Sequence, residues 1–319
     1  MIETTAPLHQ AACSTLRVGI GFSPQPDAVW SVVQAAAIAR SRFGAGRPHL
    51  ALVLTTRVPG GDLIAAVQTE LGPVSVAGGG TAGLFTEHGL ERTGSVVVCL
   101  GNADGTMSGA VMAPGRDLAE AGQTAARVML AGWPFRVHYP RGLGIALACE
   151  GMPARDFLES WRRLMGPKMR TVCAVNAGPP VFRGSVGKPP LASVACLEGA
   201  YATGFGYADG VTMEGPGADA RSLIHGSIEA TRTAMKWLDG HAARLVLVIE
   251  SEARQRALGD DAAEEWAAIR SEAGEATACL GWLCDRVAAY GRGVRPVDAE
   301  GSLMVIAIGD VTRAPLYAD

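Results

Sequence analysis

The sequence predicts an α/β protein that is built from three successive versions of one structural unit. Three apolar runs of similar length predict buried strands. An Ala-rich amphipathic helix precedes each run, and a second helix follows it. The runs begin at His49, Leu143 and Arg244. The same order of elements therefore occurs three times along the chain.

Each unit is expected to read helix, strand, helix, strand, strand, with mixed sheets and with the helices packed outside them. The first helices are expected over 27–43, 117–130 and 220–238, and the second over 61–72, 152–166 and 260–274. Two of the second helices stop at identical Gly-Pro pairs, 72–73 and 166–167, which is typical of a left-handed cap followed by a helix breaker.

The spacing of the last strands gives the length of the repeat. These strands begin at Ser95, Ser193 and Ser302, which are 98 and then 109 residues apart. A period of about 100 residues predicts a threefold repeat over approximately 15–115, 116–215 and 216–319, after a loose segment 1–14. The alternative is an ordinary α/β chain in which the elements alternate by chance.

Composition and charge exclude several classes of partner. The 319 residues carry a net charge of −3 and no long block of one sign, so nucleic acid and membrane surfaces are poor partners. Residues 1–20 lack the layout of a signal peptide, and no run approaches a membrane span, so we expect a cytoplasmic protein. The seven cysteines fit reduced, buried thiols, and no CxxC or HExxH motif supports a structural zinc site.

Small-residue loops are expected at equivalent places in the three units. They read AGGGTAG from Ala77, VNAGPP from Val175 and CLGWLCD from Cys279. If the units pack around a common axis, these loops converge and leave a crevice walled by glycines and backbone N–H groups. Such a crevice could bind a small ligand.

The loops supply most of the candidate ligand-binding residues. The glycines let backbone approach a ligand closely, an amide can both donate and accept, and the third loop offers an aromatic wall, a thiol and a charge. For the glycines the alternative is a tight bend required by packing, for the amide residue it is a routine turn, and for the tryptophan it is a place in the core. The candidates are Gly78, Gly79, Gly80, Thr81, Asn176, Gly178, Trp282, Cys284 and Asp285.

The chain resembles the FIST sensory family in three stretches. They are GRPHLALVLTT, then VAGGGTAGLFTEHGL with GSVVVCL, and finally the long stretch from RLVLVIES to DRVAAYG. The resemblance covers nearly the whole chain, as an amino-terminal region over 15–190 and a carboxy-terminal region over 191–319. It implies a sensory module for small ligands, usually coupled to a kinase, a cyclase or a chemotaxis receptor. We therefore expect signalling in trans to a partner such as a histidine kinase.

The chain departs from the family pattern at its ligand motifs. Gly79 and Leu84 stand where Cys and Glu are usual, and the middle unit has VNAGPP in place of a GGSAGD-like run. Leu283, Cys284 and Asp285 replace the usual ending of an aromatic-x-x-Gly-Glu run. The scaffold thus looks retained while the ligand chemistry looks altered, and the ligand stays open.

Some members of the family look like haem proteins that report nitric oxide, so haem is a possible cofactor. An axial ligand would then be needed. His88 and His138 are the candidates because aromatic and apolar neighbours could wall a flat ring, and the Cys284 thiolate is another option. A lone histidine is more often structural, and His225 is expected to face solvent.

An enzyme acting on a small carbonyl or amide compound is the alternative from another class. Ring-opening amidohydrolases of the cyanuric acid and barbiturate type look superficially similar, with a GGT loop and threefold repeats, but they depend on repeated Ser-Lys pairs. Lys168, Lys188 and Lys236 do not follow the repeat. Arg254 and Arg256 could clamp a carboxylate, although a solvated helix end is the favoured interpretation. The leading hypothesis is a binding protein, and whether it also catalyses a reaction stays open.

Overall fold

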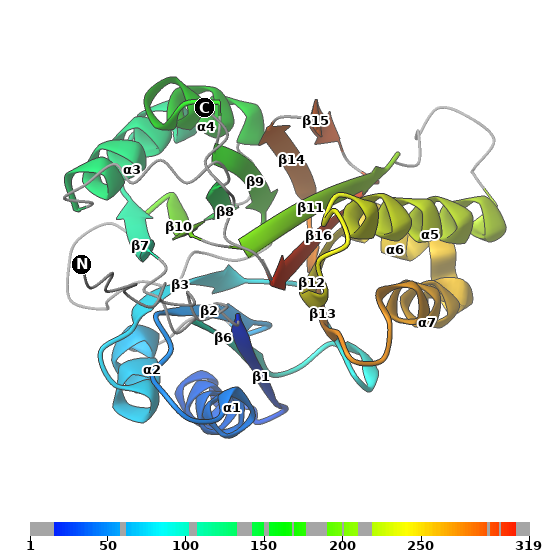
Figure 1. Cartoon of the computed structure of the whole chain (residues 1–319), viewed down its shortest axis with the longest axis horizontal. Coiled ribbons are helices and arrows are strands. Elements are labelled where there is room, and N and C mark those ends of the chain that lie inside the picture. The colour runs from blue at the N-terminus through cyan, green and yellow to red at the C-terminus, as the bar shows by residue number, and fades with distance from the viewer. Residues whose placement is uncertain are drawn as a thin grey trace, which may run out of the picture.

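The computed structural model of the chain contains three mixed sheets, and the helices lie in three groups on the outside of these sheets (Figure 1). The predicted α/β class is confirmed. The structure describes residues 16–57, 62–101, 107–132, 142–149, 153–167, 169–176, 190–199, 201–209, 219–291, 294–299 and 301–310. Within these ranges no helix has the length and apolarity to cross a bilayer.

The first unit begins with a strand that the sequence analysis did not expect. Its elements are β1 (Arg17–Ser23), α1 (Ala28–Phe43), β2 (Leu50–Thr55), α2 (Leu63–Leu71), β3 (Ser75–Gly80), the hairpin β4 (Leu84–Thr86) and β5 (Gly89–Glu91), and β6 (Ser95–Gly101). The carboxylates of Asp27 and Asp62 cap the N-termini of α1 and α2. Gly72 ends α2 with a φ of 76°, as its Gly-Pro pair predicts.

The other two units repeat this order. The second contains β7 (Met107–Ala113), α3 (Leu118–Gly132), β8 (Gly142–Ala148), α4 (Ala154–Met165), β9 (Met169–Val175) and β10 (Ala192–Glu198). The third contains β11 (Tyr201–Ala208), α5 (Ala220–Lys236), β12 (Ala243–Ser251), α6 (Glu252–Leu258), a 3₁₀ turn (Gly259–Asp261), α7 (Ala262–Ala273), β13 (Ala278–Cys284), the hairpin β14 (Arg286–Gly291) and β15 (Val294–Ala299), and β16 (Leu303–Asp310).

All three units share one strand order. The first strand lies at an edge, the last strand pairs between it and the second, and the second and third strands pair in parallel, as in β1-β6-β2-β3. The parallel pairs are β2 with β3, β8 with β9 and β12 with β13. Their carboxyl ends are where ligand sites commonly form in open α/β sheets.

Hairpins tie the units together. The hairpin β4–β5 leaves the first unit and extends the sheet of the third, where Leu84 pairs with Trp282. The hairpin β14–β15 leaves the third unit and extends the sheet of the second, where Arg286 pairs with Val175. Each hairpin therefore brings strand ends from two different units into direct contact.

One core joins the inner faces of all three sheets. It contains Leu52 and Leu54 of β2, Ile145 of β8 and Ile249 of β12, together with residues of the other strands. Three further clusters pack the outer faces of the sheets against the helices. Four cysteines of these interiors are buried, as predicted, namely Cys99, Cys173, Cys196 and Cys284.

Two of the three predicted loops are wrong. Gly78–Gly80 belong to β3, and Cys279–Cys284 belong to β13. Parallel pairing with β2 and β12 satisfies their backbone groups and overrides the weak strand preference of glycine. Of the second predicted loop, Val175 ends β9 and Asn176 comes directly after it, and the rest lies outside the described residues.

Candidate functional site

The ends of β3, β9 and β13 meet, so the predicted convergence of the three units is present. The Thr81 hydroxyl donates to the backbone oxygen of Leu283 at 2.5 Å, which joins the first and third units. The Asp285 N–H donates to the Val175 oxygen at 2.8 Å, which joins the third and second units. A Cβ built on Gly79 would lie 3.0 Å from the Asn176 amide nitrogen. Three distant segments therefore share one place.

Asn176 lies at this meeting point with no polar partner. Its side chain is 0 % exposed, and neither its amide nitrogen nor its amide oxygen hydrogen-bonds to any residue within the described ranges. Its backbone N–H donates to the Ala148 oxygen at 2.9 Å, which fixes the residue at the end of β9. A buried amide without partners costs roughly 1–3 kcal/mol, so this group calls for a ligand or an ordered water.

The glycines of β3 create the space that Asn176 uses. A Cβ at Gly79 would lie 3.0 Å from the Asn176 amide and 3.4 Å from Leu147, closer than most real contacts. The neighbouring Gly78 N–H donates to the Ser193 hydroxyl at 3.1 Å, which links the first and second units. Glycine is therefore required here by close packing between units. It does not form an open loop, since Gly78–Gly80 are all buried.

At the end of β13, two of the predicted side chains are buried and one is exposed. Trp282 and Cys284 are fully buried, whereas Asp285 is exposed. Burial raises the pKa of the Cys284 thiol well above its usual value, and the nearby Asp285 charge adds to the effect. A thiol held neutral is a poor nucleophile and a poor metal ligand. The Trp282 indole nitrogen also lacks a partner among the described residues.

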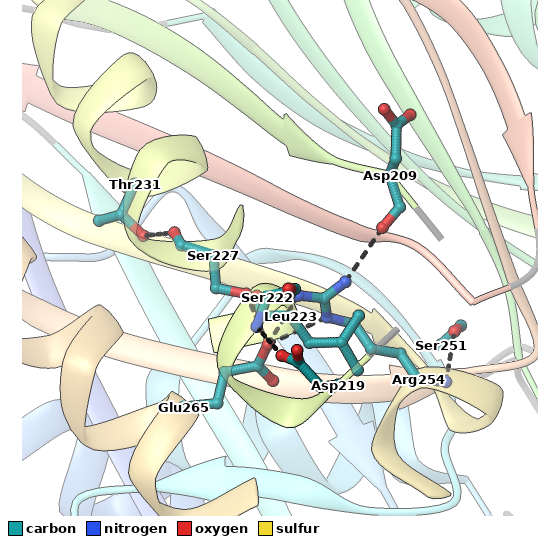
Figure 2. A network of polar contacts seen from close by, with 9 residues as sticks. All are labelled: Asp209, Asp219, Ser222, Leu223, Ser227, Thr231, Ser251, Arg254 and Glu265. Atoms are coloured by element: carbon teal, nitrogen blue, oxygen red, sulfur yellow. Dashed lines mark hydrogen bonds and ion pairs between the residues drawn. The ribbon is translucent and has the colours of Figure 1, made fainter. Parts of the chain in front are cut away.

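Arg254 belongs to a separate buried network (Figure 2). Its guanidinium lies 2.9 Å from a Glu265 carboxylate oxygen and donates to the Ser227 hydroxyl at 2.8 Å and to the Leu223 oxygen at 2.6 Å. The two charged side chains are 1 % and 2 % exposed. The expectation of a solvated helix end is wrong for Arg254, because α5, α6 and α7 close over it. The carboxylate that it clamps comes from its own chain.

Glu250 is a buried acid that sequence reasoning missed. It lies at the end of β12, is 2 % exposed, and has one carboxyl oxygen without a partner in the described part of the chain. Burial raises the pKa of Glu250 well above its usual value, the Glu265 charge raises it further, and Arg254 and Arg92 lower it. An acidic residue that ends an otherwise apolar strand was the available signal.

The serines that marked the repeat do not form a repeated set of nucleophiles. Ser193 pairs with Leu147 and shares the inner face of its sheet, whereas Ser95 pairs with Thr55 on the face toward the helices. A shift of one residue along a strand moves a side chain to the opposite face. Lys168 and Lys188 lie outside the described residues, and Lys236 ends α5.

The described residues do not fit haem. The His88 side chain is 67 % exposed at the β4–β5 turn, and its Nε2 lies 3.8 Å from a Glu87 carboxylate oxygen. An exposed turn gives no apolar enclosure for an axial ligand and its macrocycle. His138 and Gly178 lie outside the described residues, and His225 is exposed as predicted. Within the described ranges no group of three His, Cys, Asp or Glu could hold a metal ion.

Sequence comparison finds only a partial match. No protein-family model matches the chain, so the resemblance to the FIST family stays a prediction. A stretch of 89 residues is 36 % identical to Uncharacterized protein Rv0628c and to Uncharacterized protein MT0656, both from Mycobacterium tuberculosis. The match spans 27 % of this chain and 23 % of the length of those relatives.

Structural comparison finds distant likenesses. A solved structure titled "Cyanuric acid hydrolase: evolutionary innovation by structural concatenation" has a TM-score of 0.36 and 13 % identity, over 66 % of this chain and 69 % of that one. The structure of PurLQS from Thermotoga maritima has a TM-score of 0.31 and 12 % identity, over 94 % and 73 %. Likenesses of this size carry no argument about activity.

Proposed function

We propose that this chain is a small-ligand-binding protein of sensory type, and that its ligand contacts Asn176 where the ends of β3, β9 and β13 meet. The supporting observation is the Asn176 amide, which is fully buried and makes no side-chain hydrogen bond with any described residue. Because the Asn176 amide already packs against the β3 backbone at Gly79, only a compact ligand could share this place.

The amide restricts the class of ligand. Its nitrogen donates two hydrogen bonds and its oxygen accepts, so a matching ligand carries an acceptor beside a donor. A primary amide, a cyclic imide or a protonated carboxylic acid has this pair. A fully ionised carboxylate lacks the donor and would leave the Asn176 oxygen unsatisfied. Small amides are therefore the leading class.

Binding at this place would act on three units at once. Thr81, Asn176 and Asp285 come from different units, and the hydrogen bonds of Thr81 to Leu283 and of Asp285 to Val175 cross the unit boundaries beside them. A ligand shifts an equilibrium only by its different affinity for two arrangements. A ligand held between units can bind two arrangements with different affinity, because a change in the relative placement of the units changes the contacts of the ligand. The signal would then pass to a partner protein in trans.

A thermal-shift screen of small amides, imides and carboxylic acids tests the proposal. A ligand at about 100 times its Kd stabilises the native state by about 2.7 kcal/mol. The wild type should show a raised melting temperature with at least one amide. The Asn176→Leu variant, which keeps the volume and removes the polar atoms, should show no shift with that compound.

Two results would contradict the proposal. The first is an equal shift of the wild type and the Asn176→Leu variant, since the compound would then bind elsewhere. The second is the absence of any shift across the screen for a folded wild type, which would mean that ordered water satisfies Asn176. Hydrogen exchange at the strand ends, measured with and without the compound, tests the sensory step separately.

A further inference from the structure

A hollow of about 360 Å³ lies at the seam between the first and third units, away from Asn176. This volume is within the range of about 300–1000 Å³ that is typical of small-molecule sites. Arg42 of α1 and Arg270 of α7 line it, as do the acidic residues Glu87 and Glu275. Its floor is formed by apolar side chains of β1 and β13, namely Val18, Ile20, Phe22 and Leu280.

The first and third units pack their first strand and first helix in the same way. In each unit two glycines of the strand lie directly under helix carbonyls, where a Cβ would come within 2.1 Å or less. The matched contacts are Gly19 with Ala39, Gly21 with Ala35, Gly204 with Ala234 and Gly206 with Ala230. Arg42 follows Ala39 by three residues and Trp237 follows Ala234 by three. Arg42 and Trp237 therefore occupy equivalent helix positions in the first and third units.

A second equivalence comes from the parallel strand pairs. Arg170 of β9 pairs with Leu143, and Ala278 of β13 pairs with Leu245. Leu143 and Leu245 both belong to the central core, and each pairs on its other side with a core residue of the last strand of its unit, Leu197 and Ile308. Arg170 and Ala278 therefore hold the same place in the second and third units.

The seam between the second and third units is filled by an arginine side chain. The guanidinium carbon of Arg170 lies 5.6 Å from the ring centre of Phe205 and 5.7 Å from that of Trp237. Its Nη1 donates to the Thr203 oxygen at 2.6 Å. The strand supplies the cation here, and the helix supplies the aromatic ring above it.

In the seam with the hollow, the cation comes from the helix instead of the strand, and the aromatic ring is missing among the described residues. The helix position carries the cation, since Arg42 donates to the Ile20 oxygen at 3.1 Å and to a Glu87 carboxylate oxygen at 2.8 Å. The strand position carries only the methyl group of Ala278. No aromatic ring from the described residues lies over the Arg42 guanidinium. The hollow is the space that a long side chain takes up in the other seam.

We propose that this hollow binds a small aromatic carboxylate, with the ring on the β1 floor beside Arg42 and the carboxylate at Arg270. Arg270 has donors for it. Its Nη1 donates to the Glu87 backbone oxygen at 2.9 Å, and no carboxylate of the described residues lies within ion-pair distance of its guanidinium. A guanidinium binds a carboxylate in bidentate geometry and stacks on aromatic rings, so both arginines suit this class.

Fluorine NMR with a fluorinated benzoate tests this site on the full chain. Bound ligand relaxes faster than free ligand, so the wild type should broaden the fluorine signal. The Ala278→Phe variant places a ring of its own in the hollow and should weaken binding about tenfold or more. The Ala278→Ser variant keeps the size of the side chain and should bind as the wild type does. Cyclohexanecarboxylate should compete less well than benzoate, because it cannot stack.

The outcomes that overturn the site are distinct from those that overturn the proposed function. Equal binding by a folded Ala278→Phe variant would contradict the hollow as the site. If that variant does not fold, Arg270→Gln takes its place, and unchanged binding would then be the contradicting result. Loss of benzoate binding in Asn176→Leu, with retention in the Ala278 variants, would move the ligand to the strand ends. No broadening by the wild type also rejects the site.

Discussion

Two buried polar clusters of this molecule differ in how their polar atoms are satisfied. In the cluster around Arg254, the guanidinium meets a carboxylate, a hydroxyl and backbone carbonyl oxygens, all within 3.1 Å. At the meeting of the three strand ends, the Asn176 side chain has no partner among the described residues. The Arg254 guanidinium is satisfied by its own chain, whereas our proposal assigns the Asn176 amide to a ligand. Four variants test this contrast.

The largest effect is expected for Arg254→Leu. The change leaves the Glu265 carboxylate buried without its cation, and breaking a buried pair in this way costs about 3–5 kcal/mol. Urea unfolding followed by circular dichroism measures the loss. Arg256→Ala is the matched control, because its side chain is 71 % exposed and should change stability by less than about 0.5 kcal/mol. Similar losses for both variants would contradict a structural role of the network.

The opposite sign is expected for Asn176→Leu in the absence of ligand. Replacing an unsatisfied amide by an apolar group of similar volume should raise the free energy of unfolding by about 1–3 kcal/mol. The same urea titration gives the value. A loss of stability would mean that the amide has partners in the folded state, and the contrast between the two clusters would disappear.

Glu250→Gln should change how stability depends on pH. Burial raises the pKa of Glu250, so above the ordinary value of 4.5 the unfolded state releases a proton that the folded state keeps. Stability therefore falls as pH rises, by at most about 1.4 kcal/mol per pH unit, until the folded-state pKa is passed. The glutamine variant should lose less stability than the wild type between about pH 5 and about pH 8. Parallel melting curves of the two proteins would contradict this.

The smallest effect is expected for Ser193→Ala. The serine hydroxyl accepts from the Gly78 N–H at 3.1 Å and is the polar link between the first and second units near Asn176. Its removal should cost about 1 kcal/mol, the typical net value of one hydrogen bond. Differential scanning calorimetry can resolve this loss. No loss at all would show that the Gly78 N–H finds another acceptor.

Much of the fold follows from local patterns. The apolar runs from His49, Leu143 and Arg244 are strands, and the first helices of the units begin near the predicted Asp27, Asp117 and Ala220. These predictions succeed because burial on one face leaves a periodic trace in the sequence. The first strand of each unit leaves a weaker trace, since glycines such as Gly19 and Gly21 break the apolar alternation. These glycines let a helix pack closely on the strand, and the strand pattern does not reveal this role.

The candidate site could be predicted only in outline. The three strand ends do converge, as the repeat implied, but two of the expected loops are strands. The serine spacing found the right strands and missed their register, so Ser95 and Ser193 lie on opposite faces. Arg254 was misjudged and Glu250 was missed because their burial depends on how α5 and α7 pack over them, which the local pattern does not show.

The order of elements in the three units, the helix caps and the apolar faces follow from local patterns, because each element depends on residues within a few positions of one another. Three features appear only in the folded chain: which hairpin extends which sheet, the packing of Asn176 against Gly79, and the seam that Arg170 fills while Ala278 leaves a hollow in another. All three are contacts between units. A contact depends on two distant surfaces, and a local pattern records only one of them.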